Sequence, residues 1–179
     1  MPKFRVHFEA DVEFGRCVVA PAESTEAAEQ SSKSDTLFRL IYKSRSKIPE
    51  NKRDSELSDI FRVARRNNAE KGITGALLLY DDWFTQTLEG DEGAVRALFA
   101  RIAKDDRHDS VEVQEQGVAS TRVFSRWAMA QVAEHGECDI PLIATTTGVA
   151  EAAARSSTSE QDRVLALMRN ATRGYGKGY

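Results

Sequence analysis

The chain has 179 residues, of which 41% are hydrophobic and 30% charged, with a formal net charge of −3 at pH 7, as expected of a globular protein with one domain and extensions. This charge gives no reason to expect nucleic acid or an anionic membrane as a partner. No run approaches the roughly 20 apolar residues of a membrane helix and no signal-peptide run opens the chain, so we expect a cytoplasmic protein.

The sequence divides into four parts. Residues 1–20 are predicted as a strand-like extension, because apolar and mostly charged residues alternate from Phe4 to Phe14. Residues 21–35 are small and polar, which indicates a linker. Residues 36–132 form the predicted main domain, and residues 133–179 are expected to form a helical cap with a loose tail.

The main domain contains both strand and helix patterns. The predicted elements are a strand at 36–43, a helix at 54–71, a hairpin of strands at 73–80 and 83–89, a helix at 91–104, and strands at 111–118 and 126–132. Asp54 or Ser55 can cap the first helix, and Gly72 suits its end. The hairpin turn is Asp81-Asp82.

This order predicts an α+β fold, a ferredoxin-like βαββαβ sandwich with both helices on one face of an antiparallel-rich sheet. We expect the first and third strands to be parallel neighbours at the centre of the sheet. The strand at 126–132 is an addition to this core. C-terminal helices, including one at 159–172, are predicted to cover the other sheet face.

Several polar side chains occupy positions that the pattern assigns to the core. Tyr42 follows Phe38 and Leu40 on one strand face, and Gln86 lies between Phe84 and Leu88 on another. Asn67 and Asn68 continue the apolar stripe of the first helix. These amides can simply satisfy nearby backbone groups; together with the tyrosine they can also orient a planar ligand that carries alternating N–H and C=O groups.

The second helix and the last strand add residues with ordinary structural explanations. Arg101 and Asp105 have the i, i+4 spacing of a surface ion pair, and Arg107-His108 follow at the helix end. Trp127 and Met129 are expected on one face of the last strand, where core packing explains them.

Other chemistries have no support in the sequence. It has three histidines and no HExxH or Cys/His cluster, which argues against a zinc site. It also lacks a GxGxxG motif, a phosphate loop and a GxSxG motif. Cys17 and Cys138 can pair, although two separate thiols are the expectation for a cytosolic protein.

Six motifs in unbroken order resemble the BLUF domain, the family of sensors of blue light using FAD. They are FRLIYKS at 38–44, ARRNNA at 64–69, GITGALLLY at 72–80, FTQTLEG at 84–90, RIAKDDRH at 101–108 and FSRWAM at 124–129. The resemblance covers about residues 36–132. It implies a ferredoxin-like fold with the isoalloxazine ring of FAD between the two helices.

The resemblance also implies roles for individual residues. Tyr42 would give an electron and a proton to the excited flavin, Gln86 would bridge Tyr42 and the flavin, and Trp127 and Met129 would couple the pocket to the other sheet face. Asn68 would hold the O4/N3 edge of the ring. The other expected cofactor-binding residues are Arg101 and Asp105 at the O2/N3 side, Ile60 and Ile102 on the ring faces, Asn67 near the ring and ribityl chain, and Arg107 and His108 near the ring or phosphates.

The sequence therefore predicts a blue-light photoreceptor that holds FAD, is not an enzyme, and signals to an unknown downstream protein. We also expect a homo-oligomer, with no nucleic-acid or membrane partner. One alternative is a light-silent flavin-binding interaction module, and another is a flavin enzyme. A yellow colour that shifts under blue light distinguishes the photoreceptor from both.

Overall fold

The structure, a computed structural model, describes residues 36–134, 136–145, 148–150 and 157–173, with the backbone alone for 143–145 and 148–150. The predicted N-terminal strand, the linker and the C-terminal tail from residue 174 onward lie outside these residues. Within the described ranges, none of the helices combines the length and the apolar character needed to span a membrane.

The described part contains the expected elements and short additional strands. In chain order they are β1 (Phe38–Ser46), the 3-10 helix η1 (Glu50–Lys52), α1 (Arg53–Glu70), β2 (Thr74–Tyr80), β3 (Trp83–Gly90), α2 (Glu92–Ile102), β4 (His108–Val118), β5 (Ala130–Ala133), β6 (Ile140–Pro141), β7 (Ile143–Thr145), β8 (Gly148–Ala150) and α3 (Ser159–Arg173). The first six strands form one sheet in the order β4-β1-β3-β2-β5-β6, and β7 and β8 form a separate pair.

The central strands β1 and β3 are neighbours, as expected, but they are antiparallel, so the expectation of a parallel pair was wrong. The two-residue turn Asp81-Asp82 makes β2 and β3 an antiparallel hairpin. The crossover through α1 connects β1 to β2, and these two strands run in the same direction. The strand β3 lies between them and is antiparallel to both.

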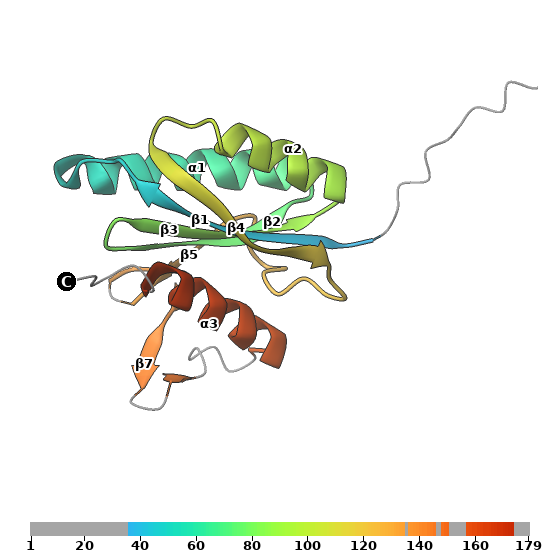
Figure 1. Cartoon of the computed structure of the whole chain (residues 1–179). Coiled ribbons are helices and arrows are strands. Elements are labelled where there is room, and N and C mark those ends of the chain that lie inside the picture. The colour runs from blue at the N-terminus through green and yellow to red at the C-terminus, as the bar shows by residue number, and fades with distance from the viewer. Residues whose placement is uncertain (1–35, 135, 146–147, 151–156, 174–179) are drawn as a thin grey trace, which may run out of the picture. The chain divides into compact units, whose positions relative to one another are not determined.

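The described elements form three layers (Figure 1), with α1 and α2 on one face of the sheet and α3 on the other. One hydrophobic cluster lies between the sheet and the first two helices and contains Phe38, Leu40, Tyr42, Phe61 and Val95. A second cluster lies beneath α3. Its members include Ile41, Phe124, Val132, Leu165 and Met168. The ferredoxin-like fold with a helix covering the second face is confirmed.

Several predicted boundaries differ from the structure, and three of them bear on the site. The N-cap of α1 is Lys52, which follows the turn at Pro49, and neither Asp54 nor Ser55 caps the helix. The helix α2 ends at Ile102, so Asp105 is not on it. The last strand begins only at Ala130, because the carbonyls of residues 127–129 accept hydrogen bonds from the Gly75 backbone and from side chains of α1.

The end of α1 is fixed by Gly72, as predicted. Its φ of 62° places it in the left-handed region that favours glycine. The Gly72 N–H donates to the Ala69 carbonyl and the Ile73 N–H donates to the Asn68 carbonyl, which is the Schellman pattern. Asn68 therefore lies in the last turn of α1, and its backbone carbonyl takes part in the turn that leads toward β2.

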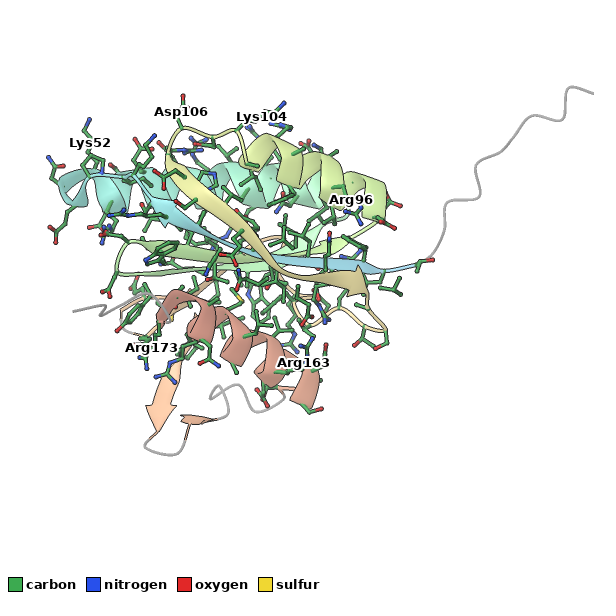
Figure 2. The ribbon with its side chains drawn as sticks, in the orientation of Figure 1. Lys52, Arg96, Lys104, Asp106, Arg163 and Arg173 are labelled. Carbon is green, nitrogen blue, oxygen red and sulfur yellow. The ribbon has the colours of Figure 1, made fainter. Side chains whose placement is uncertain are left out.

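Ion pairs hold α3 against the sheet. Buried Arg39 on β1 contacts buried Glu89 on β3 at 2.9 Å and Glu160 on α3 at 2.6 Å. The Glu89 carboxylate also accepts hydrogen bonds from the backbone N–H groups of Val123 and Phe124. Figure 2 shows Arg163 and Arg173 toward opposite ends of α3, where they pair with Glu115 and Glu134 respectively.

Candidate functional site

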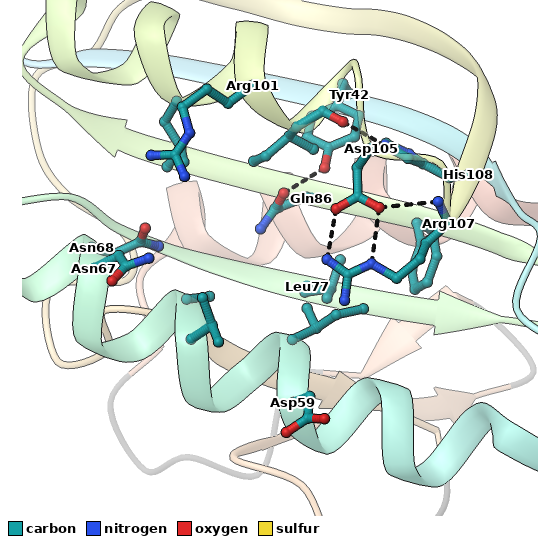
Figure 3. A pocket seen from close by; sticks show the side chains of 16 residues that line it. Tyr42, Asp59, Asn67, Asn68, Leu77, Gln86, Arg101, Asp105, Arg107 and His108 are labelled. Carbon is teal, nitrogen blue, oxygen red and sulfur yellow. Dashed lines mark hydrogen bonds and ion pairs between the residues drawn. The ribbon is translucent and has the colours of Figure 1, made fainter.

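A cavity of about 260 Å³ lies over the sheet between α1 and α2 (Figure 3). Every residue predicted for the site lines it, except Trp127 and Met129. The predicted residues that line it are Tyr42, Ile60, Asn67, Asn68, Gln86, Arg101, Ile102, Asp105, Arg107 and His108. The structure thus brings together side chains from β1, α1, β3, α2 and the segment that leads into β4.

Tyr42 and Gln86 form the polar centre of the cavity floor. They are paired residues of adjacent strands, 3% and 5% exposed, and the Tyr42 hydroxyl donates a hydrogen bond to Gln86 Oε1 at 2.5 Å. Burial raises the pKa of the Tyr42 phenol far above its ordinary value, and the charge of Asp105 adds to the rise. The phenol therefore stays protonated and available as a donor at physiological pH.

The other end of the Gln86 amide contacts Met129. Gln86 Nε2 donates to Met129 Sδ at 3.3 Å, and Met129 is 1% exposed. Met129 belongs to the cluster on the cavity side of the sheet, whereas Trp127 packs against the cluster beneath α3. The prediction that these two residues share one face of the last strand was wrong, because both precede β5.

Two asparagines approach the cavity from the last turns of α1. Asn68 is 1% exposed, and its Nδ2 donates to the Ala128 carbonyl at 2.9 Å. The neighbouring carbonyl of Met129 accepts a hydrogen bond from Arg65 Nε at 3.1 Å. The segment that carries Met129 is therefore tied to α1 at two successive residues. Asn67 also lines the cavity, across from Arg101 on α2 (Figure 3).

The surface ion pair that the spacing of Arg101 and Asp105 allowed as an alternative is not formed. Asp105 instead accepts two side-chain hydrogen bonds from Arg107, at 2.9 and 2.6 Å (Figure 3). These bonds lower the pKa of Asp105 to about 2. Arg101 is exposed at the edge of the cavity and has no ion-pair partner among the described residues. Its guanidinium is therefore available to a ligand.

Sequence reasoning did not identify several lining residues. They are Asp59, Val63, Ala64, Leu77, Phe84 and Leu98. Asp59, Val63 and Asn67 follow one another at intervals of four, so the helical period could have found the first two. No sequence signal could have found the Ala128 carbonyl as the partner of Asn68, because that contact depends on how the loop before β5 folds back onto α1.

The cavity suits a planar aromatic ring with polar edges. Apolar side chains of both helices and of the strands form its walls, while Asn67, Asn68, Gln86 and Arg101 supply amide and guanidinium groups. Such groups match a heterocycle edge of alternating carbonyl and N–H groups. Its volume of about 260 Å³ is slightly below the about 300–1,000 Å³ of drug-sized sites.

Comparison with protein families gives a match over residues 37–130, to the model described as BLUF, sensors of blue-light using FAD. This segment includes all the residues that line the cavity. It carries every predicted site residue as well.

Relatives with curated descriptions include photoactivated adenylate cyclase subunits beta of Euglena longa and Euglena gracilis, each 36% identical over 111 residues, or 62% of this chain. The match covers only 13% of those proteins, so this chain spans about an eighth of their length.

Solved structures of short proteins are also similar. The photo-activated state of BlsA has a TM-score of 0.52 and 34% identity, covering 53% of this chain and 68% of that one. The dark-state structure of the BLUF protein BlrB has a TM-score of 0.51 and 33% identity, covering 54% of this chain and 72% of that one.

Proposed function

Because the chain belongs to the BLUF family of blue-light sensors that use FAD, we propose that it is a photoreceptor in which Tyr42 and Gln86 convert light absorption into a changed hydrogen bond. The observation that supports this role most directly is the Tyr42–Gln86 hydrogen bond on the floor of the cavity. When bound, FAD would supply the blue-light absorption and an excited state that accepts an electron.

Tyr42 is the electron and proton source in this proposal. Its phenol lines the cavity and is kept neutral by burial. Loss of an electron makes a phenol strongly acidic, and the nearest partner of its proton is Gln86 Oε1 at 2.5 Å. Tyr42 would give the electron to the excited flavin and the proton along this bond, and it would regain both on recombination. The change that lasts until dark reversal would then be in the Gln86 amide alone. The cycle has no net turnover, which is why we propose a sensor without enzymatic activity.

Gln86 is the switching element. Its amide bonds Tyr42 through Oε1 and Met129 through Nε2. Once the Tyr42 proton moves, the Oε1 contact no longer has its donor, and the amide can rotate or change tautomer. A rotated amide would aim Nε2 at a different acceptor and would weaken the contact with Met129, so the change at the cavity floor would reach the segment before β5.

The remaining cavity residues would hold and orient the cofactor. Asn68 and Asn67 would meet one edge of the ring and Arg101 another, with Ile60 and Ile102 on its two faces. Asp105 would act indirectly, by orienting the Arg107 side chain with two hydrogen bonds. Arg107 and His108 line the end of the cavity next to Tyr42 (Figure 3).

Signal output would go to a partner protein, and we also propose that the protein forms a homo-oligomer. A partner must contact the dark and lit states differently for light to shift its binding. The helix α3 is a candidate relay, because the sheet that it covers carries Gln86 on its opposite face. Light scattering after size exclusion, in darkness and under blue light, tests the assembly.

The experiment that tests the proposal is a light-minus-dark absorption spectrum of the purified protein with FAD. A small red shift that appears under blue light and reverses in the dark is the expected result. A bound flavin with a static spectrum would instead support the light-silent interaction module. A protein that takes up no FAD would overturn the proposal.

A further inference from the structure

His108 connects the end of α2 to the central strand β1. Its Nε2 is 2.7 Å from the carbonyl oxygen of Ile102, the last residue of α2, and its Nδ1 is 2.7 Å from Ser44 Oγ. Ser44 is fully buried and lies two residues after Tyr42, on the same face of β1. The imidazole therefore bridges the helix layer and the sheet beside the cavity.

The two contacts determine where the ring proton resides. A carbonyl oxygen can only accept a hydrogen bond, so Nε2 carries the proton and donates to Ile102. In the neutral ring Nδ1 then has a lone pair, and the Ser44 hydroxyl donates to it. Both nitrogens are in use within the protein. A hydrogen bond from His108 to a cofactor would cost one of these contacts.

The residues that His108 joins are next to the groups that matter for the proposed photochemistry. Ile102 and Tyr42 both line the cavity. The imidazole also packs edge-on against Phe84, with ring centroids 6.5 Å apart and planes at 82°, and is tilted against Tyr42 at 6.5 Å. It thus contacts two side chains of the adjacent strands β1 and β3, while its Nε2 reaches the backbone at the end of α2.

We infer that His108 is a positioning residue that, by bonding both the Ile102 carbonyl and the Ser44 hydroxyl, sets the separation between the end of α2 and Tyr42. This inference rests on the proposed function. The spacing determines how closely the phenol approaches a ring held against Ile102. Reaction rates are sensitive to such spacing, since a displacement of about 1 Å can change a rate about 100-fold.

Four variants of the FAD-loaded full chain test this inference. His108→Leu removes both hydrogen bonds, His108→Gln restores a donor for the Ile102 carbonyl, and Ser44→Ala removes only the second contact. The matched control is Ser46→Ala on the same strand, whose hydroxyl accepts from the Ile48 N–H at 3.2 Å and makes no bond to the imidazole. The readouts are the flavin fluorescence lifetime in the dark, the rate of dark recovery, and the ¹⁵N resonances of the His108 ring.

In His108→Leu, which loses both hydrogen bonds, we expect the flavin lifetime and the recovery rate to change by at least about fivefold, the scale of a single hydrogen bond. Ser44→Ala should change both in the same direction, His108→Gln should restore part of the effect, and the control should match the wild type. If His108→Leu does not fold or does not bind FAD, Ser44→Ala tests the inference by itself, because Ser44 does not line the cavity. Wild-type lifetime and recovery in Ser44→Ala would overturn the inference.

The ring resonances separate this inference from the proposed function. In the dark wild type we expect a protonated Nε2 and an unprotonated Nδ1, and Ser44→Ala should move the Nδ1 resonance. An unprotonated Nε2, or an unmoved Nδ1, would refute the bridge whether or not the protein responds to light. A wild type without a photoshift would refute the proposed function and leave the resonance test intact.

Discussion

Tyr42 and Gln86 face each other in the register of the two central strands, and their side chains share a hydrogen bond of 2.5 Å. Because both residues belong to regular strands, their relative position is fixed by the backbone ladder and not by a loop. The part of the pair that can still rotate is the side-chain amide of Gln86, which is hydrogen-bonded through both Oε1 and Nε2. The photochemical role proposed for this pair can therefore be tested by small side-chain changes that leave the sheet intact.

Tyr42→Phe removes the hydroxyl and keeps the aromatic ring. We expect the variant to bind FAD and to show no light-induced absorption shift, because it has neither the donor to Gln86 nor the transferable proton. Its free energy of unfolding should fall by about 1 kcal/mol, the value of one hydrogen bond. The control is Tyr80→Phe, whose ring lies over Arg173 outside the cavity, and which should retain the shift. A normal shift in Tyr42→Phe would contradict the proposed role.

Met129→Leu replaces the sulfur that accepts from Gln86 Nε2 with a carbon of similar volume. We expect FAD binding and the shift to persist and the dark-recovery rate to change, because the dark orientation of the amide has lost one partner. Packing alone should cost under about 1.5 kcal/mol. Met168→Leu, equally buried but on α3 at the other face of the sheet, is the matched control and should recover at the wild-type rate. Equal recovery rates in the two variants would speak against a role for Met129.

Glu89→Ala should be the most destabilising single substitution among the ion pairs. It leaves Arg39 buried without its closest sheet partner and removes the acceptor of two backbone N–H groups. We expect a loss of about 3–5 kcal/mol in the free energy of unfolding, measured by urea denaturation. Glu92→Ala breaks an exposed pair with Arg96 and should cost under about 1 kcal/mol. Similar losses of unfolding free energy in the two variants would show that the contribution of these ion pairs does not depend on their burial.

Acid should weaken the fold partly through Asp105. Its pKa is lowered from 3.8 to about 2 by the Arg107 guanidinium, so the ionised form stabilises the folded state above pH 3.8. This contribution is lost as the pH falls from about 4 to about 2. Asp105→Asn should therefore flatten the decline of the unfolding free energy in this window, whereas Asp106→Asn, at an exposed neighbour, should not. Unchanged slopes in Asp105→Asn would contradict the link with Arg107.

Gly75→Ala should disrupt the sheet even though alanine is a small residue. A Cβ at this position on β2 would collide with the backbone carbonyl oxygen of Thr87 on β3, which cannot move without breaking the ladder. We expect severe loss of stability and of bound FAD, measured by thermal unfolding and flavin absorbance. Gly117→Ala on β4 meets open space and should be tolerated. A stable Gly75→Ala protein would show that β2 and β3 can separate locally.

The parts of the fold that sequence could predict are those governed by local periodicity. Alternation on β1 and β3 placed Tyr42 and Gln86 on one face, and the positive φ at Gly72 matched the expected helix end. The motifs resembling BLUF domains then identified the polar residues that line the cavity apart from Asp59. These signals are local because strands and helices repeat every few residues.

The sequence could not predict contacts that depend on loops. Asp105 was given helical i, i+4 spacing to Arg101, although α2 ends at Ile102, so its partner Arg107 was missed. Trp127 and Met129 were assigned to one strand face, although their loop folds so that they contact opposite sides of the sheet. The parallel orientation expected for β1 and β3 was wrong for a different reason, since it ignored the reversal imposed by the hairpin.

Successive side chains of β3 point to opposite faces of the sheet, so this one strand contributes residues to both sides of it. Phe84, Gln86 and Leu88 face the side of the sheet that carries the cavity, while Thr85, Thr87 and Glu89 face the side that α3 covers. The hydroxyls of Thr85 and Thr87 are buried and make no hydrogen bond within the described residues. Substitutions at successive residues of β3 should therefore have alternating effects. Those facing the cavity should change the absorption spectrum of the bound flavin, and those facing the other side should weaken the packing of α3 on the sheet.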